Sequence, residues 1–178
     1  GCTEPMAVAL CTARATELLG QRPEHISVLL SANILKNAMG VGIPGTGMIG
    51  LPIAIALGAL VGKSEYQLEV IKDLTPVTLE AGKTFISENR IDVKLKDGIT
   101  EKLYIEITCE AEGHRATAII MGTHTNIVFE EKDGTVLLDK MQPSTAAVEK
   151  APLCLNLNTV WEFATTTPVD EIEFILEA

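Results

Sequence analysis

The sequence predicts an α+β protein with N-terminal helices and a Gly-rich loop, then an antiparallel β-meander, then closing C-terminal helices. Two observations lead to this class. Apolar residues before Asn89 recur mainly at helical spacing, whereas apolar and polar residues alternate after it. We therefore divide the chain into a helical part (1–88), a meander (89–150) and closing helices (151–178), and expect them to pack as one compact unit.

The helical part contains recognisable start and stop signals. Thr3-Glu4-Pro5 predicts a helix start, because proline is tolerated in the first turn, and Gly20 predicts its end. The apolar run at 26–30 is typical of a buried strand. Further segments follow in order: a short helix near 34–39, the Gly-rich loop, an apolar helix from about Gly50, a helix capped by Ser64 and a helix starting at Thr75-Pro76.

The meander is indicated by alternation and by turn residues. Apolar residues alternate over 91–95 and 103–109, and the chain continues through 115–121, 126–130 and 136–138. Turns are expected at 96–98, 112–113 and 133–134, where glycine follows an acidic residue. Two helices, 157–164 and 169–176, are expected to close the chain.

Composition limits the classes of function. The chain has 178 residues, 47% of them hydrophobic, and a formal net charge of -10. Because phosphate binding needs clustered lysine and arginine, this charge argues against a nucleic-acid partner. The uncharged span 37–62 is interrupted by glycines and prolines, so we interpret it as a core helix and expect no membrane partner. We expect a cytoplasmic protein.

The most informative stretch is 31–62, in which Lys36 is the one charged residue. Glycines there would let backbone N–H groups approach an anion at the positive end of a helix. That arrangement suits a small carboxylate beside Lys36 and the amides of Asn33 and Asn37. The alternative, close packing of a buried helix on its neighbour, stays open.

Three further features could support chemistry. Cys2 lies just before a helix N-terminus, which favours the thiolate that a metal ligand needs, although local physics alone favours an ordinary thiol over a ligand. His124, in the run His124-Thr125-Asn126, could act as a general base, or be a structural residue at a strand end. The run 45–50 matches GxGxxG, but no strand leads directly into it, so nicotinamide binding is a weaker alternative. Cys11 and Cys109 fit apolar core positions.

Several motifs in this order resemble the L-cysteine desulfidase family, which is related to the alpha chain of iron–sulfur L-serine dehydratases. The motifs are Gly1-Cys2-Thr3-Glu4-Pro5, Ser31-x-Asn33-x-x-Lys36-Asn37, the glycine-rich run 41–54, Leu68-Glu69-Val70 and His124-Thr125-Asn126-Ile127. The resemblance covers the whole chain. It implies that the chain is the N-terminal part of a longer protein.

The resemblance implies a function, a cofactor and a set of site residues. The function is α,β-elimination on L-cysteine or L-serine with a [4Fe–4S] cluster, in which Cys2 matches one cluster ligand. The other ligands would lie in an absent C-terminal part of the same protein, so the fragment alone would be inactive and without the cluster. Lys36 and His124 are the candidates for the catalytic base. The hypothesis places Asn33, Asn37, Thr46 and Asn126 around a small amino-acid substrate.

A different class of function is a non-catalytic module that binds or senses an amino acid through the Gly-rich loop. The number of protomers is left open by the sequence, and a homo-oligomer is one alternative.

Overall fold

Helix α1 (Glu4–Leu19) runs through the interior, because almost every residue along it is apolar or small. Pro5 stands in its first turn, where a missing N–H is harmless, and Gly20 ends it in the left-handed conformation with φ of 80°. Both ends agree with the sequence prediction. The helix contacts α3 on one side and strands β3 and β4 on the other. It therefore forms the main contact between the helices and the sheet.

The computed structural model describes residues 3–141 and 156–168. Contacts divide the chain into two compact units, residues 1–142 and 143–178, and each is described by itself. The elements of the first unit after α1 are β1 (His25–Leu30), α2 (Ala32–Ala38), α3 (Leu51–Leu60), the 3₁₀ helix η1 (Ser64–Glu69), α4 (Pro76–Ser87), β2 (Ile91–Leu95), β3 (Tyr104–Ala111), β4 (His114–Met121), β5 (Ile127–Lys132) and β6 (Thr135–Asp139).

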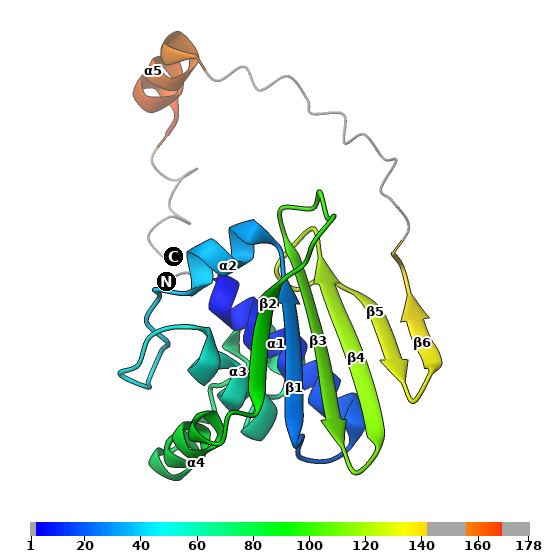
Figure 1. Ribbon diagram of the computed structural model, residues 1–178. Coiled ribbons are helices and arrows are strands. Elements are labelled where there is room, and N and C mark those ends of the chain that lie inside the picture. The colour runs from blue at the N-terminus through cyan, green and yellow to red at the C-terminus, as the bar shows by residue number, and fades with distance from the viewer. Residues whose placement is uncertain (1–2, 142–155, 169–178) are drawn as a thin grey trace. The chain divides into compact units, whose positions relative to one another are not determined.

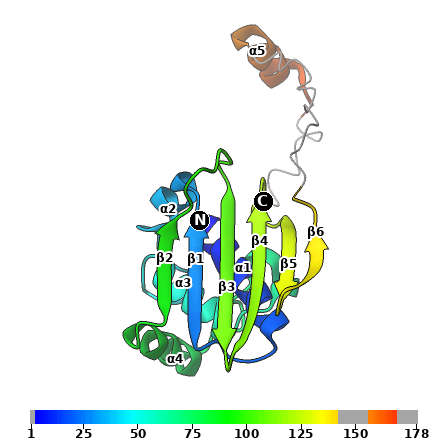
Figure 2. The ribbon, with the colours of Figure 1, turned by 45° about the vertical axis from the view of Figure 1, so that its right-hand side comes forward.

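The six strands form one mixed sheet in the order β2-β1-β3-β4-β5-β6. Helices α1 and α3 lie against one face of it, and within residues 3–141 no helix lies on the opposite face (Figure 1, Figure 2). Ile105, Ile107 and Cys109 of β3 point toward the helices and are fully buried. The α+β class predicted from the sequence is confirmed.

Strands β3 to β6 form the predicted antiparallel meander, but β2 does not belong to it. Strand β1 lies between β2 and β3, and β1 and β2 are parallel, with Ile26 beside Ile91. The expectation of a hairpin at 96–98 is therefore wrong. The physical reason is that α2 to α4 return the chain to the start of β1, and a parallel pair then forms across this long connection.

Helix α3 confirms the predicted core helix. Its side chains are almost all buried, and it has 10 residues, about half of what a bilayer crossing needs. None of the helices in the described ranges combines the length and the apolar character of a membrane span. Gly58 lets α3 approach α1 closely, because a Cβ at this position would lie 2.5 Å from the carbonyl oxygen of Ala9.

In the second unit the described residues form α5 (Leu157–Thr166). The Asn156 side chain accepts a hydrogen bond from the Thr159 amide, and the Asn156 amide donates to the Thr159 hydroxyl, forming a capping box. The first predicted closing helix is thus present. The second, 169–176, lies outside the described residues, and the packing of 151–178 with the rest stays a prediction.

Candidate functional site

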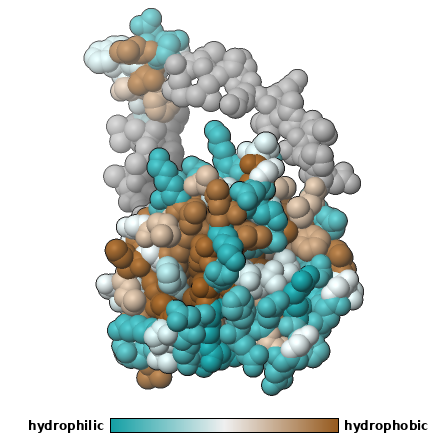
Figure 3. Space-filling view, in the orientation of Figure 1, coloured by the Kyte–Doolittle hydropathy of each residue, from teal (hydrophilic) through white to brown (hydrophobic). Residues whose placement is uncertain are grey.

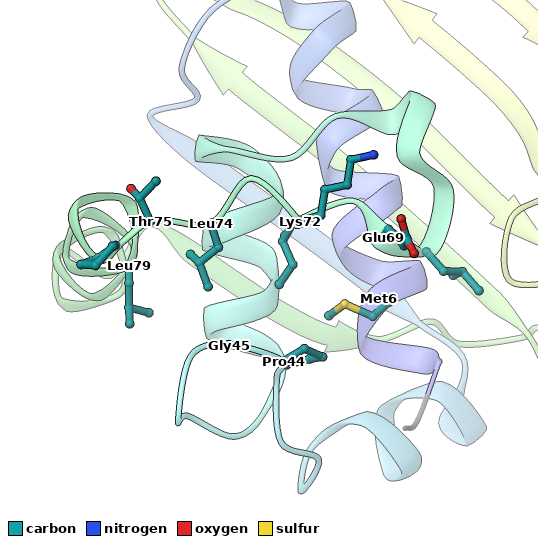
Figure 4. Close-up of a pocket in the computed structure, with 11 residues that line it drawn as sticks. Met6, Pro44, Gly45, Glu69, Lys72, Leu74, Thr75 and Leu79 are labelled. Carbon is teal, nitrogen blue, oxygen red and sulfur yellow. The ribbon is translucent and has the colours of Figure 1, made fainter.

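A cavity of about 600 Å³ lies beside the N-terminal half of α1. Four segments that are distant in sequence surround it: the start of α1, the Gly-rich loop, the chain from η1 to α4, and the first turns of α4 (Figure 4). Its lining is mainly apolar and consists of Met6, Pro44, Gly45, Leu68, Glu69, Ile71, Lys72, Leu74, Thr75, Pro76 and Leu79. In Figure 4, Met6 and Glu69 lie on the opposite side from Leu74 and Leu79.

The wall between η1 and α4 is shaped by two buried anchors and one unusual backbone conformation. Val70 and Ile71 insert into the core, so Leu68 and Leu74 on either side remain half-buried at the cavity. Gln67, just before Leu68, has φ of 53° and ψ of -124°. An L-residue rarely adopts this conformation, which costs on the order of 1–3 kcal/mol. The strain is thus located directly beside the cavity wall.

Helix α4 contributes Leu79 from its first turns. The Thr75 hydroxyl accepts a hydrogen bond from the Thr78 amide at 3.2 Å, and the Thr75 amide donates to the Thr78 hydroxyl at 2.9 Å. This reciprocal cap, with Pro76 following it, defines where the helix begins. The Thr75 hydroxyl is therefore already engaged in the helix cap.

The Gly-rich loop is a small hairpin with internal hydrogen bonds. Gly42 and Ile49 form an antiparallel bridge, and the Gly50 amide donates to the carbonyl of Val41. The Thr46 hydroxyl donates to the carbonyl of Ile43 at 2.8 Å and accepts from the Met48 amide at 2.9 Å. Several of the amides that we expected to face an anion thus bond within the loop.

Gly45 connects this hairpin to the cavity. Its φ of 74° lies in the left-handed region, which glycine adopts without strain. A Cβ at this position would lie 3.2 Å from a methyl group of Leu74. The loop therefore contacts the cavity wall through backbone. Exposed apolar residues flank it, since Met39 and Ile49 are 56% and 70% exposed. Figure 3 shows hydrophobic side chains gathered over the region of α2, α3 and β2.

Two charged side chains line the cavity, and they differ in their surroundings. The Lys72 ammonium lies 3.5 Å from the centre of the Tyr66 ring, a cation–π contact. Lys63 contacts the same tyrosine, because its ammonium donates to the Tyr66 hydroxyl at 3.2 Å, and it also donates to the Asp73 carboxylate at 2.6 Å. That hydrogen bond from Lys63 lowers the pKa of Asp73. Among the described residues, the Glu69 carboxylate has no hydrogen bond or ion pair.

The predicted site residues that the structure describes do not line this cavity. Asn33, Lys36 and Asn37 are exposed on α2, and the Asn37 side chain donates to the Glu4 carboxylate at 3.2 Å. Asn33 borders a separate, shallower depression formed with the connection 95–102. Thr46 is held inside its own loop. Within the described part, no hydrogen bond joins any two of these four side chains.

His124 and Asn126 lie in the turn between β4 and β5. Because β1 and β4 both run antiparallel to β3, this turn is at the same end of the sheet as α2. The Asn126 side chain donates to the carbonyl of Met121 at 3.0 Å, which stabilises the turn. Cys2 lies outside the described residues.

The buried thiols have structural surroundings. The Cys11 thiol contacts the carbonyl of Ala118 at 3.3 Å, and burial raises its pKa strongly. Burial likewise raises the pKa of Cys109 to about 12. Both thiols are therefore protonated near neutral pH. Within residues 3–141 and 156–168, no group of three or more His, Cys, Asp or Glu side chains is arranged to hold a metal ion.

The sequence reasoning assigned none of the cavity residues Leu68, Leu74 and Leu79 to a site, although Leu68 belongs to one of the motifs. A usable signal was present. Apolar residues recur between 68 and 74 without a helical or a strand period, on a segment between two helix starts. Apolar residues without a helical or strand period pack against segments that are distant in the sequence.

Comparison with known proteins shows that the chain is similar to several proteins named UPF0597. It is 66% identical to a UPF0597 protein of Bacteroides fragilis over 177 residues, which are 99% of this chain and 41% of that relative. UPF0597 proteins of Porphyromonas gingivalis and Aeromonas hydrophila are 50% and 44% identical, with coverage of 42% and 41% of their lengths. The chain thus spans about two fifths of these relatives. No protein-family model and no solved structure matches it.

These relatives correct the family resemblance inferred from the motifs. They are named UPF0597 proteins and not L-cysteine desulfidases, so the assignment to that family and the iron–sulfur lyase activity inferred from it are wrong. The iron–sulfur cluster depended on that resemblance, whereas the roles of Lys36 and His124 stay predictions. In the structure, Gly42, Thr46 and Gly50 have local roles in a hairpin, so the glycine-rich motif is explained by a backbone shape. The chain is similar to UPF0597 proteins over nearly its whole length.

Proposed function

We propose that this chain binds a small, largely apolar molecule in the cavity between α1, the Gly-rich loop and the start of α4. The observation that supports the proposal is the cavity itself, with its volume of about 600 Å³ and its mainly apolar lining. Small-molecule sites in proteins typically measure about 300–1,000 Å³ and combine apolar walls with a few polar groups. The cavity has both properties.

The lining explains how such a ligand would gain affinity. Each methylene group transferred from water to an apolar wall contributes about 0.8 kcal/mol, which is close to a fourfold gain in affinity. Affinity should therefore rise with chain length in a series of alkyl compounds, until the cavity is filled. Met6 adds adaptability, since its thioether adjusts to ligands of different shape.

Binding of N-phenylnaphthylamine, an uncharged fluorescent probe, tests this proposal. Leu79→Asp places a carboxylate on the half-buried cavity wall and should lower probe affinity about tenfold or more, since the apolar contact of a leucine contributes about 1.5–3 kcal/mol. Val77→Asp is the matched control, because Val77 lies on the same helix, is 78% exposed and is not part of the lining.

Circular dichroism and thermal unfolding establish that both variants keep the fold. Equal affinity of the two variants for the probe would show that binding occurs elsewhere, for example at the exposed apolar residues of α5. That result would contradict the proposal.

Two further proposals concern the rest of the protein and its cellular compartment. Because the chain spans about two fifths of its relatives, we propose that the bound molecule is used together with a further part of a longer protein. We also propose a cytoplasmic setting. Co-purification of separately expressed parts of a relative tests the first statement, and independent elution of the parts would contradict it.

A further inference from the structure

The two charged side chains of the cavity lining, Glu69 and Lys72, differ in whether they have a partner. The Glu69 carboxylate lies at the lining and makes no hydrogen bond or ion pair within the part of the chain that the structure describes. The one lysine of the lining, Lys72, has its ammonium 3.5 Å from the centre of the Tyr66 ring. In Figure 4 its ammonium group points away from Met6 and Leu74, so its aliphatic stem is the part that borders the cavity.

The position of the Lys72 ammonium is supported by a second layer of contacts. Lys63 contacts Tyr66 through both its hydroxyl, at 3.2 Å, and its ring, at 5.2 Å. The same Lys63 ammonium is paired with Asp73 at 2.6 Å. Tyr66 therefore contacts two lysines, one of which is also paired with the Asp73 carboxylate.

The start of α4 offers little to an anion. Helix N-termini attract anions through free amide groups, but Pro76 has no amide hydrogen and the Thr78 amide donates to the Thr75 hydroxyl. Only Val77 remains in the first turn to donate an amide. The polar side of the cavity is thus dominated by one unpaired carboxylate.

We infer that the ligand of this cavity is an amphipathic amine, with its apolar body among Met6, Leu74 and Leu79 and its protonated amino group beside Glu69. This inference rests on the proposed function and narrows its ligand class. A carboxylate at the edge of an apolar cavity attracts a cation and repels an anion, and both effects favour an amine over an acid of equal length. The energy of an exposed ion pair corresponds to about two- to fivefold in affinity.

Octylamine and octanoate provide matched probes, since they share an alkyl chain length and differ in the sign of the charge. Isothermal titration with the complete chain at neutral pH should show octylamine binding about two- to fivefold more tightly than octanoate. This factor is the part of the preference that Glu69 contributes, in addition to the attraction of the net negative charge for any amine. Glu69→Gln should remove this preference, and octanol, an uncharged probe of the same chain length, measures any accompanying change in apolar binding. Lys72→Met should increase it, because the one cation of the lining is then absent.

Glu65→Gln is the control for the net charge of -10, which by itself attracts any amine. Glu65 lies in the same 3₁₀ helix, is exposed and does not line the cavity. Loss of preference in Glu69→Gln but not in Glu65→Gln supports the inference. Equal binding of amine and acid, or equal effects of the two glutamine variants, would overturn it and leave the cavity as an apolar site. Binding of neither octanol nor octylamine would overturn the proposed function itself.

Discussion

Arg14 of α1 and Glu130 of β5 form a two-point contact across 116 residues of sequence. The Nε atom of Arg14 donates to Oε1 at 2.7 Å, and its Nη2 atom donates to Oε2 at 3.0 Å. Glu130 is 9% exposed, and its hydrogen bond raises the pKa of Arg14 further. Such a paired geometry is stronger than a single exposed contact and fixes orientation as well. The contact therefore stabilises the packing of α1 on β5.

The first prediction concerns this pair. Arg14→Met should lower the free energy of unfolding by about 2–4 kcal/mol, because the Glu130 carboxylate is left largely buried without its partner. Urea unfolding measures the change. Arg115→Met is the matched control, since Arg115 also pairs with a glutamate of β5 but is 56% exposed. Its loss should stay below about 1 kcal/mol, and equal losses in both variants would contradict the interpretation.

The second prediction concerns the crossing of α1 and α3. Gly58→Ala should lower the free energy of unfolding by about 1–3 kcal/mol, even though alanine favours helices, because a Cβ would lie 2.5 Å from the Ala9 carbonyl oxygen. For a chain of this size, each kcal/mol shifts the melting temperature by about 2–4 °C.

Gly40→Ala serves as the control for the loss of a glycine. A Cβ at Gly40 would meet no atom within 4 Å, and its φ is not positive. A stability of Gly58→Ala equal to that of Gly40→Ala would show that α1 and α3 are separated widely enough to admit a Cβ at position 58.

The third prediction is a pH dependence caused by Cys109. Burial raises its pKa from 9.0 to about 12, so the folded state keeps the proton that the unfolded state loses. Stability from this group is complete below pH 9 and falls as pH rises from 9 toward 12. At pH 10 the loss is about 1.4 kcal/mol for this thiol.

The measurement compares wild type with Cys109→Ala in urea at pH 8 and pH 10. The variant is less stable at both values because it leaves a cavity, but its decrease between them should be about 1.4 kcal/mol smaller. The difference of slopes isolates the thiol from tyrosines and lysines that titrate in the same range. Parallel slopes would show that Cys109 does not contribute.

The fourth prediction concerns the strained backbone at the cavity wall. Gln67→Gly should raise the free energy of unfolding by about 1 kcal/mol, since glycine adopts φ of 53° and ψ of -124° without a clash. Gln67→Val should lower it, because a β-branched residue fits that conformation poorly. Glu65→Gly, at an exposed position of the same element, should be destabilising. A loss of stability in Gln67→Gly would argue against strain.

Local signals were sufficient for most elements. Pro5 and Gly20 mark the ends of α1, and the apolar composition of 51–60 indicates a buried helix, because these properties act within a few residues of chain. The alternation from 104 to 139 predicted the meander for the same reason, since hairpins connect neighbouring strands through short turns.

The candidate site was less accessible to the same reasoning. The Gly-rich loop was singled out correctly as an unusual backbone, and its Pro44 and Gly45 do line the cavity. The predicted polar residues of α2 and of the β4–β5 turn do not, because a motif carries no information on which distant segment will face it. The unpaired carboxylate of Glu69 is recognisable only once its neighbours are placed.

By itself, the sequence determined the types of most elements, many of their ends and the burial of α3. Only the tertiary structure decided that β2 lies beside β1, that Arg14 meets Glu130, and that Met6, Leu68 and Leu79 enclose one cavity. The physical reason is the range of the forces concerned. Propensity and capping act between neighbours in sequence, whereas strand pairing and cavity walls depend on the packing of segments that the chain brings together from far apart.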